Sequence, residues 1–167
     1  LIFERKVVPF QSLNFFYGSQ QKAHSDAIHM STYPLGFMAA SWTALEDISA
    51  GSGELEYYPG SHRLPYVFSH DCGISDEEYV TEGRNSYSEK YEKYVENLIR
   101  SKGLKSERFL PKKGDVLIWH HNLLHGGSPR TNSSLTRKAF VCHYFAEGVV
   151  CYHDLINEQA KLLEQAR

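Results

Sequence analysis

The chain has few cysteines, no long apolar run and no excess of positive charge, and each absence excludes a class of protein. Its three cysteines, Cys72, Cys142 and Cys151, are an odd number without C-x-x-C spacing. They indicate reduced thiols inside a cell rather than a disulfide framework. No apolar run approaches the length of about 18 residues that a membrane-spanning helix needs, and no signal-peptide pattern is present. We therefore expect a cytoplasmic protein that does not insert into a membrane.

The charge balance is nearly even, with 18 Lys and Arg against 20 Asp and Glu and a pI near 6.5. Proteins that bind nucleic acid or anionic membranes through their overall field carry an excess of positive charge. Neither kind of partner is therefore expected here. The 167 residues, 41% of them apolar, suit one globular domain with a substantial core. Nothing in the sequence indicates the oligomeric state.

Short segments rich in β-branched and aromatic residues recur along the chain, separated by turn-forming residues. They predict strands over residues 6–17, 20–26, 37–48, 54–58, 108–110, 114–121 and 137–145. Many short strands separated by turns are typical of a β-sandwich or barrel, and a jelly roll fits best. The sequence therefore predicts a single all-β domain over residues 1–167.

Residues 66–108 have a different pattern and are predicted to be a helical insertion between strands. Apolar side chains recur there at helical spacing, in the order Tyr91, Tyr94, Val95, Leu98 and Ile99. This amphipathic helix is expected to end near Gly103. A further short helix is expected to follow Asp154.

The tripeptide His24-Ser25-Asp26 places an imidazole and a carboxylate two residues apart in a segment expected to be extended. Successive side chains of a strand point to opposite faces, so His24 and Asp26 fall on the same face. Two histidines and one carboxylate form a site that leaves positions on Fe(II) open for other ligands. His125, beyond the strand predicted at 114–121, is the candidate for the third ligand. An H-x-D tripeptide by itself is common by chance, so further motifs are needed.

The chain has nine histidines, and most are expected to have no part in a metal site. His29 lies five residues beyond His24, which would place it on the opposite face of a continuing strand. His120 and His121 are interpreted as strand residues, one pointing inward and one outward. His62 is expected to order the turn at 59–63. His70 and His153 are expected at the surface.

Other motifs accompany these ligands: residues 42–45, residues 53–63, Gly114-Asp115, His125-Gly126, and residues 137–139 followed by Cys142-His143. Together with His24-Ser25-Asp26, and in the same order over residues 11–63 and 114–147, they resemble the phytanoyl-CoA dioxygenase family of Fe(II)- and 2-oxoglutarate-dependent oxygenases. The resemblance implies the double-stranded β-helix, a cupin-type jelly roll, and Fe(II) held by His24, Asp26 and His125. The chain opens with Leu1 rather than Met, so an N-terminal region of the family is expected to be absent.

Arg137 begins the last predicted strand and is the candidate for binding the distal carboxylate of 2-oxoglutarate. A planar guanidinium can hold a carboxylate with two parallel hydrogen bonds, which a lysine cannot. Arg130 competes for this role but lies in a loop of Pro, Asn and Ser residues. By resemblance, three further residues would flank the cosubstrate: Trp42, Asn14 and Ser128. Asn14 attracts attention because it lies in an apolar strand, where a buried amide needs partners.

The resemblance implies hydroxylation of a C–H bond in a small-molecule substrate, with use of 2-oxoglutarate and O2, release of succinate and CO2, and support from ascorbate. In halogenating relatives a small residue replaces the carboxylate ligand, and Asp26 at this position favours a hydroxylase. The alternative is a non-redox cupin-like protein that only binds a metal. A nucleic-acid demethylase is disfavoured by the lack of a basic stripe. The family name does not define the substrate, because no CoA-binding element is recognisable.

Overall fold

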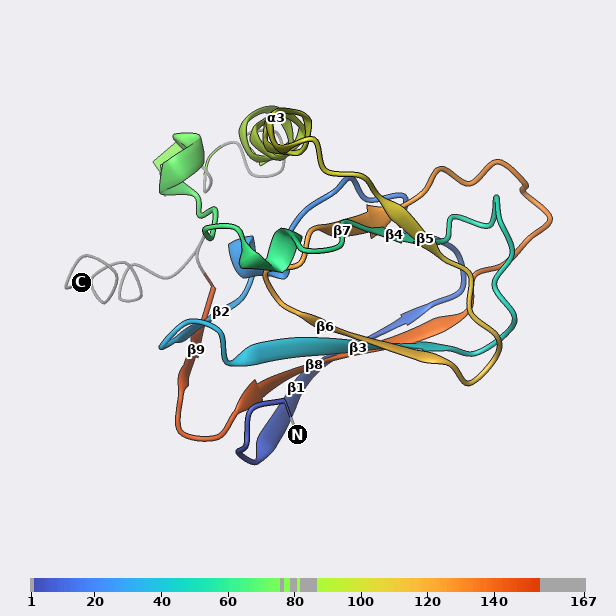
Figure 1. Ribbon diagram of the computed structural model, residues 1–167, viewed down its shortest axis with the longest axis horizontal. Coiled ribbons are helices and arrows are strands. Elements are labelled where there is room, and N and C mark those ends of the chain that lie inside the picture. Colours follow the sequence, from blue (N-terminus) through green and yellow to red (C-terminus); the bar gives the residue numbers. More distant parts are fainter. Residues whose placement is uncertain (1, 76, 79–80, 82–86, 154–167) are drawn as a thin grey trace.

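The computed structural model of the protein describes residues 2–75, 77–78, 81 and 87–153. Two antiparallel sheets form most of it and face each other across the core (Figure 1). Helical segments lie outside the strands at one end, where α3 is seen end-on. This arrangement confirms the predicted all-β jelly roll with a helical insertion.

The larger sheet has four antiparallel strands in the order β1-β8-β3-β6. They are β1 (Val7–Phe15), β3 (Met38–Ala44), β6 (Val116–His120) and β8 (Ala139–Ala146). Because side chains alternate along a strand, every second residue of β3 faces the core. Ala40, Trp42 and Ala44 accordingly pack there with Trp119 and Val141. One face of this sheet is thus the inner wall of the domain.

The opposing sheet has three strands in the order β5-β4-β7, and two further strands, β2 and β9, pair separately. Their bounds are β2 (Ser31–Tyr33), β4 (Leu55–Tyr57), β5 (Glu107–Phe109), β7 (His125–Gly127) and β9 (Val150–Tyr152). Leu55 of β4 closes the core from this side. The space between the two sheets is where the candidate site lies.

The helical insertion packs on the segment that carries the predicted metal ligands. It contains η3 (His70–Cys72), η4 (Tyr87–Glu92) and α3 (Lys93–Lys102), and η2 (Ser61–Arg63) precedes it. Tyr91 and Val95 are fully buried against Ile28 and Leu124. Gly103 ends α3 in the left-handed conformation, with a φ of 61°, as predicted. The helix expected after Asp154 lies outside the described residues.

The prediction of a strand over residues 20–26 is wrong. Only His24 pairs, in an isolated antiparallel bridge with His125, and the 3-10 helix η1 (Asp26–Ile28) follows directly. The strands β2, β7 and β9 were not predicted. Each has three residues, and β7 reads His-Gly-Gly, which carries no β-forming preference. Their pairing depends on partners distant in the sequence.

Cys72, Cys142 and Cys151 form no disulfide with one another. Among the described residues, no helix combines the length and the apolar character that crossing a membrane requires.

Candidate metal centre

His24, Asp26 and His125 converge on one buried point between the sheets. Each can offer one ligand atom, and these atoms lie within 4.8 Å of one another. The main chain holds the two histidines together, because His24 and His125 each donate an N–H to the other's carbonyl at 2.9 Å. Their rings are 4.5 Å apart between centroids. The structure therefore brings together the three residues predicted as metal ligands.

The side chains of His24 and Asp26 lie on the same side because Ser25, the residue between them, has an extended backbone. Ser25 has φ −102° and ψ 148°, and Asp26 then begins η1. The Ser25 N–H donates to the Tyr91 hydroxyl at 3.0 Å, so a side chain of the insertion anchors the ligand segment. The alternation of side chains expected for a strand therefore holds from His24 to Asp26. It fails for His29, since the 3-10 turn brings that ring to 6.0 Å from His24.

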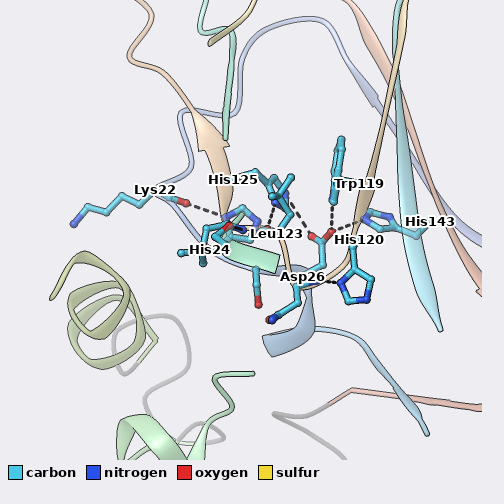
Figure 2. Close-up of polar contacts among 12 residues, drawn as sticks. Lys22, His24, Asp26, Trp119, His120, Leu123, His125 and His143 are labelled. Carbon is cyan, nitrogen blue, oxygen red and sulfur yellow. Dashed lines mark hydrogen bonds and ion pairs between the residues drawn. The ribbon is translucent and has the colours of Figure 1, made fainter. Parts of the chain in front are cut away.

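Backbone carbonyls orient both imidazoles. Nδ1 of His24 lies 2.9 Å from the carbonyl oxygen of Lys22, and Nδ1 of His125 lies 3.0 Å from that of Leu123 (Figure 2). A carbonyl only accepts, so each Nδ1 donates to it, which leaves Nε2 as the atom of each ring that could ligate a metal. Burial, reinforced by His125, lowers the pKa of His24 to about 3. His24 is therefore neutral at physiological pH, as a metal ligand must be.

The two carboxylate oxygens of Asp26 have different surroundings (Figure 2). Oδ1 lies 3.6 Å from Nε2 of His125, whereas Oδ2 accepts a hydrogen bond from the Trp119 indole at 2.9 Å and lies 3.6 Å from Nε2 of His143. Burial alone raises the pKa of the Asp26 carboxyl, but His125 and His143 hold it below its ordinary value. Asp26 is thus a carboxylate. The two nitrogens and one oxygen fit the donor set of a non-haem iron centre.

A narrow cavity of about 80 Å³ connects this cluster with Arg137. A water needs about 10–15 Å³ on this measure, so the cavity has room for several waters or a small dicarboxylate. Trp42 and Val141 form part of its wall. The predicted cosubstrate residue and the predicted ligands therefore line the same cavity.

Arg137 is a buried cation without a counter-ion among the described residues. Its side chain is packed against the rings of Phe15 and Trp42, and the residue is only 2% exposed. Burial lowers its pKa to about 10, still well above neutral. Nε and Nη2 of Arg137, and Nε1 of Trp42, have no hydrogen-bond partner in the described part of the chain. A buried charge is costly when unpaired, and an anion in this cavity would offset that cost. The residues fit 2-oxoglutarate.

The structure does not bring Asn14 or Ser128 into this cavity. Asn14 is exposed on β1, where its neighbours Leu13 and Phe15 line the cavity and strand alternation turns Asn14 to the other face. The expectation of a buried amide at Asn14 is therefore wrong. Ser128 is buried, but its hydroxyl donates to Glu56 at 3.3 Å and it does not line the cavity. Arg130 donates to backbone carbonyls in its own loop.

A second, wider cavity of about 660 Å³ adjoins the cluster. It shares His24, Asp26 and His143 with the narrow cavity and is also lined by His29 and His153. His29, His143 and His153 were not predicted as site residues. Strand parity points to His143, which lies six residues after Arg137 and hence on the same face of a regular strand. No sequence pattern points to His29, because the 3-10 turn determines its position.

His121 gives the protein a pH-dependent stability that can be measured without metal. Its side chain is fully buried, Nδ1 donates to the Met38 carbonyl at 3.0 Å, and burial lowers its pKa from 6.5 to about 4. Between these pH values the unfolded chain binds more protons than the folded one, so the free energy of unfolding rises with pH. One such group contributes about 1.4 kcal/mol per pH unit.

We expect the His121→Asn variant to lose this contribution, since an amide can still donate to Met38 but does not titrate. Urea unfolding in EDTA between pH 4.5 and 7 measures the slope for both proteins. Other titrating groups, including His24, act equally in both and cancel in the difference. An unchanged slope in the variant would contradict the assignment of a neutral, buried His121.

The sequence matches a family model and several characterised proteins. The model of the phytanoyl-CoA dioxygenase (PhyH) family matches residues 12–139. The peroxisomal phytanoyl-CoA dioxygenase of Bos taurus is 29% identical over 147 residues, which are 88% of this chain and 40% of that protein. Phytanoyl-CoA dioxygenase domain-containing protein 1 of Danio rerio is 27% identical over 129 residues, 75% of this chain and 39% of that protein. The chain thus spans about 40% of the length of these relatives.

Solved structures show the same fold. The non-heme alpha ketoglutarate dependent carbocyclase SnoK superposes with a TM-score of 0.62 and 15% identity, covering 96% of this chain and 57% of that chain. The epimerase SnoN, in complex with Fe3+, alpha ketoglutarate and nogalamycin RO, gives a TM-score of 0.56 and 17% identity, covering 86% of this chain and 51% of that chain. Since the family model matches well over half of the residues, the chain belongs to the phytanoyl-CoA dioxygenase (PhyH) family.

Proposed function

We propose that the protein is an Fe(II)- and 2-oxoglutarate-dependent dioxygenase that hydroxylates a C–H bond of a small molecule. The observation that carries the proposal is the unpaired, buried guanidinium of Arg137 in the same cavity as the three candidate ligands. Three ligands alone fit many metal proteins. An anion pocket next to them is what a 2-oxo acid requires.

His24, Asp26 and His125 would hold the iron, and Arg137 would bind the distal carboxylate of 2-oxoglutarate. Iron with this cosubstrate and O2 supplies the oxidation of an unactivated C–H bond, with release of succinate and CO2. Trp42 and Phe15 exclude water from the guanidinium, which strengthens its interaction with a carboxylate. The Asp26 carboxylate occupies the position that a halide would need, which supports hydroxylation over halogenation.

The alternative is a cupin-like protein that binds a metal without redox chemistry. Such a protein has no use for a buried arginine without a counter-ion beside its metal ligands. The cost of burying that charge is explained by an anionic cosubstrate and by nothing in a purely structural metal site. The dioxygenase is therefore the better proposal.

The wider cavity beside the ligand cluster is the proposed site for the primary substrate. His24 and Asp26 line it and Arg137 does not, so a substrate bound there would lie beside the metal site and away from the guanidinium. Its size suits a small molecule, and nogalamycin RO bound to SnoN is of this kind. The lack of a disulfide between the three cysteines supports the proposal that the protein works in the cytoplasm.

The proposal predicts that 2-oxoglutarate stabilises the protein only when a divalent metal is present. A ligand that binds only the folded state raises the free energy of unfolding, by about 2.7 kcal/mol at 100 times its Kd, and therefore raises the melting temperature. Thermal unfolding with Mn(II), a redox-inert substitute for Fe(II), measures this effect. Glutarate is the matched control, because it keeps both carboxylates but lacks the 2-oxo group that chelates a metal. Equal stabilisation by glutarate, or stabilisation in EDTA, would contradict the proposal.

Catalysis is tested by succinate release with Fe(II), ascorbate and 2-oxoglutarate in the presence of metabolite pools. The expected result is metal-dependent succinate release that increases with one pool. Hydroxylation is established when the product of that pool gains one oxygen atom by mass. A halogenated, cyclised or epimerised product would keep the cosubstrate chemistry but replace the proposed outcome.

A further inference from the structure

The surroundings of Asp26 point to a role for His143 that rests on the proposed metal site. Of the two carboxylate oxygens, Oδ1 faces His125 and the other metal ligands, whereas Oδ2 faces two rings from the large sheet (Figure 2). The Trp119 indole donates to Oδ2 at 2.9 Å, and Nε2 of His143 lies 3.6 Å from the same oxygen. One oxygen is thus available for a metal and the other is held by the protein.

The sheet explains why these two rings meet at one oxygen. Trp119 on β6 and His143 on β8 both pair with Ala40 of the intervening strand β3. All three side chains therefore lie side by side on the inner face. The methyl group of Ala40, which is fully buried, leaves space above it for the carboxylate between the two larger rings. Two strands thus supply donors to a ligand that comes from the separate segment 24–28.

The imidazole of His143 has no other hydrogen-bond or ion-pair partner among the described residues. The residue is 4% exposed, its Nδ1 lacks a hydrogen-bond partner in the described chain, and the ring of Phe10 lies 6.1 Å away between centroids. Nδ1 has no acceptor and the carboxylate 3.6 Å from Nε2 only accepts, so these surroundings favour the tautomer with its proton on Nε2. A buried imidazole aimed only at a metal ligand is typical of an outer residue that orients that ligand.

We propose that His143 is a positioning residue that donates from Nε2 to Oδ2 of Asp26 and, with Trp119, presents Oδ1 to the metal. His143 holds the carboxylate in its ligating orientation before the metal arrives. The orientation of Asp26 then costs no free energy when the metal binds. Removing the donor should therefore weaken metal binding, and partners of this kind contribute about 10–100-fold in metal affinity.

The test is Co(II) affinity, measured by competition with a fluorescent chelator and without 2-oxoglutarate. The amide nitrogen of a glutamine lies near the position of imidazole Nε2, whereas that of an asparagine lies near Nδ1. We expect His143→Gln to retain most of the wild-type affinity. His143→Asn and His143→Leu should lose about 10–100-fold. Unfolding of the metal-free variants in EDTA separates this loss from a general loss of stability.

The pair of amide variants decides the outcome, even if His143→Leu does not fold. An asparagine variant that binds Co(II) as tightly as the glutamine variant would overturn the role of Nε2. Failure of the proposed function is distinguishable from this result. A wild-type protein that binds Co(II) but releases no succinate would contradict the dioxygenase and leave the positioning role standing.

Discussion

Arg137→Ala is expected to weaken the binding of 2-oxoglutarate on the order of 100-fold while metal binding stays unchanged. A hydrogen bond to a charged group contributes about 1.5–3 kcal/mol, and a guanidinium can make two with one carboxylate. Two bonds at the lower figure amount to about 3 kcal/mol, or roughly a hundredfold in affinity. Arg137 is the candidate because it lies in the narrow cavity with Nε and Nη2 unpaired in the described structure.

The effect is measured as the dependence of succinate release on 2-oxoglutarate and as the anaerobic affinity of the Fe(II) protein for it. Arg137→Lys keeps the charge but not the planar pair of donors, so an intermediate affinity is expected. Arg130→Ala is the matched control. The Arg130 guanidinium donates to the carbonyls of Ser133 and Leu135, outside the cavity. A loss of 2-oxoglutarate affinity in Arg130→Ala, with none in Arg137→Ala, would transfer the role to Arg130.

Removing Arg137 should not destabilise the metal-free protein by as much as its burial suggests. The variant loses contacts with the rings of Phe15 and Trp42 but also removes an unpaired buried charge. These effects oppose each other. A folded variant that binds Co(II) normally would show that Arg137 acts on the cosubstrate and not on the metal.

The residues that the sequence identified are those whose placement depends on local geometry or on strand parity. His24 and Asp26 share a face because Ser25 between them is extended, and Arg137 lies just before the recognisable strand β8. His143 obeys the same parity and could have been predicted from Arg137. The fold class was likewise accessible, because the larger sheet is built from strands with clear β-forming composition.

The positions that the sequence did not reveal depend on contacts between distant segments. Strand β7 exists because His125 pairs with both Tyr57 and His24. No local preference of His-Gly-Gly predicts such a strand. Gly126 permits this approach, since a Cβ there would lie 2.7 Å from the carbonyl oxygen of Gln21. The different surroundings of the two Asp26 oxygens arise from the register of three strands around Ala40, which no single segment encodes.

Asn14 shows how the composition of a strand can mislead when the facing residues are not known. An amide among apolar residues suggested a buried polar contact, yet the apolar neighbours Leu13 and Phe15 are the residues that line the cavity. Asn14 pairs with Phe140 and is exposed. In an edge strand such as β1, the polar residue is the one that faces solvent.

Asp26→Ala is expected to abolish both iron retention and succinate release. The change removes one of three ligands and leaves the Trp119 indole without its acceptor in a buried site. Asp26→Glu keeps the charge but lengthens the arm by one methylene within a closely packed site. Misplacement by about 1 Å can cost on the order of a hundredfold in rate, so iron is expected to remain in part while turnover falls strongly.

Asp26→Asn separates charge from shape and completes the series. Its amide oxygen can still accept from Trp119, so the metal-free variant should fold like the wild type, but a neutral ligand binds a hard cation weakly. Iron content after anaerobic loading and succinate release are measured for all three variants, with unfolding in EDTA as the control for folding. The order expected for iron content is wild type, then Glu, then Asn, then Ala.

If Asp26 only satisfied Trp119 and His143, the Asn variant would keep iron and turnover. Wild-type iron content and succinate release in Asp26→Ala would end the dioxygenase proposal, because the remaining pair, His24 and His125, is not the ligand set on which it depends.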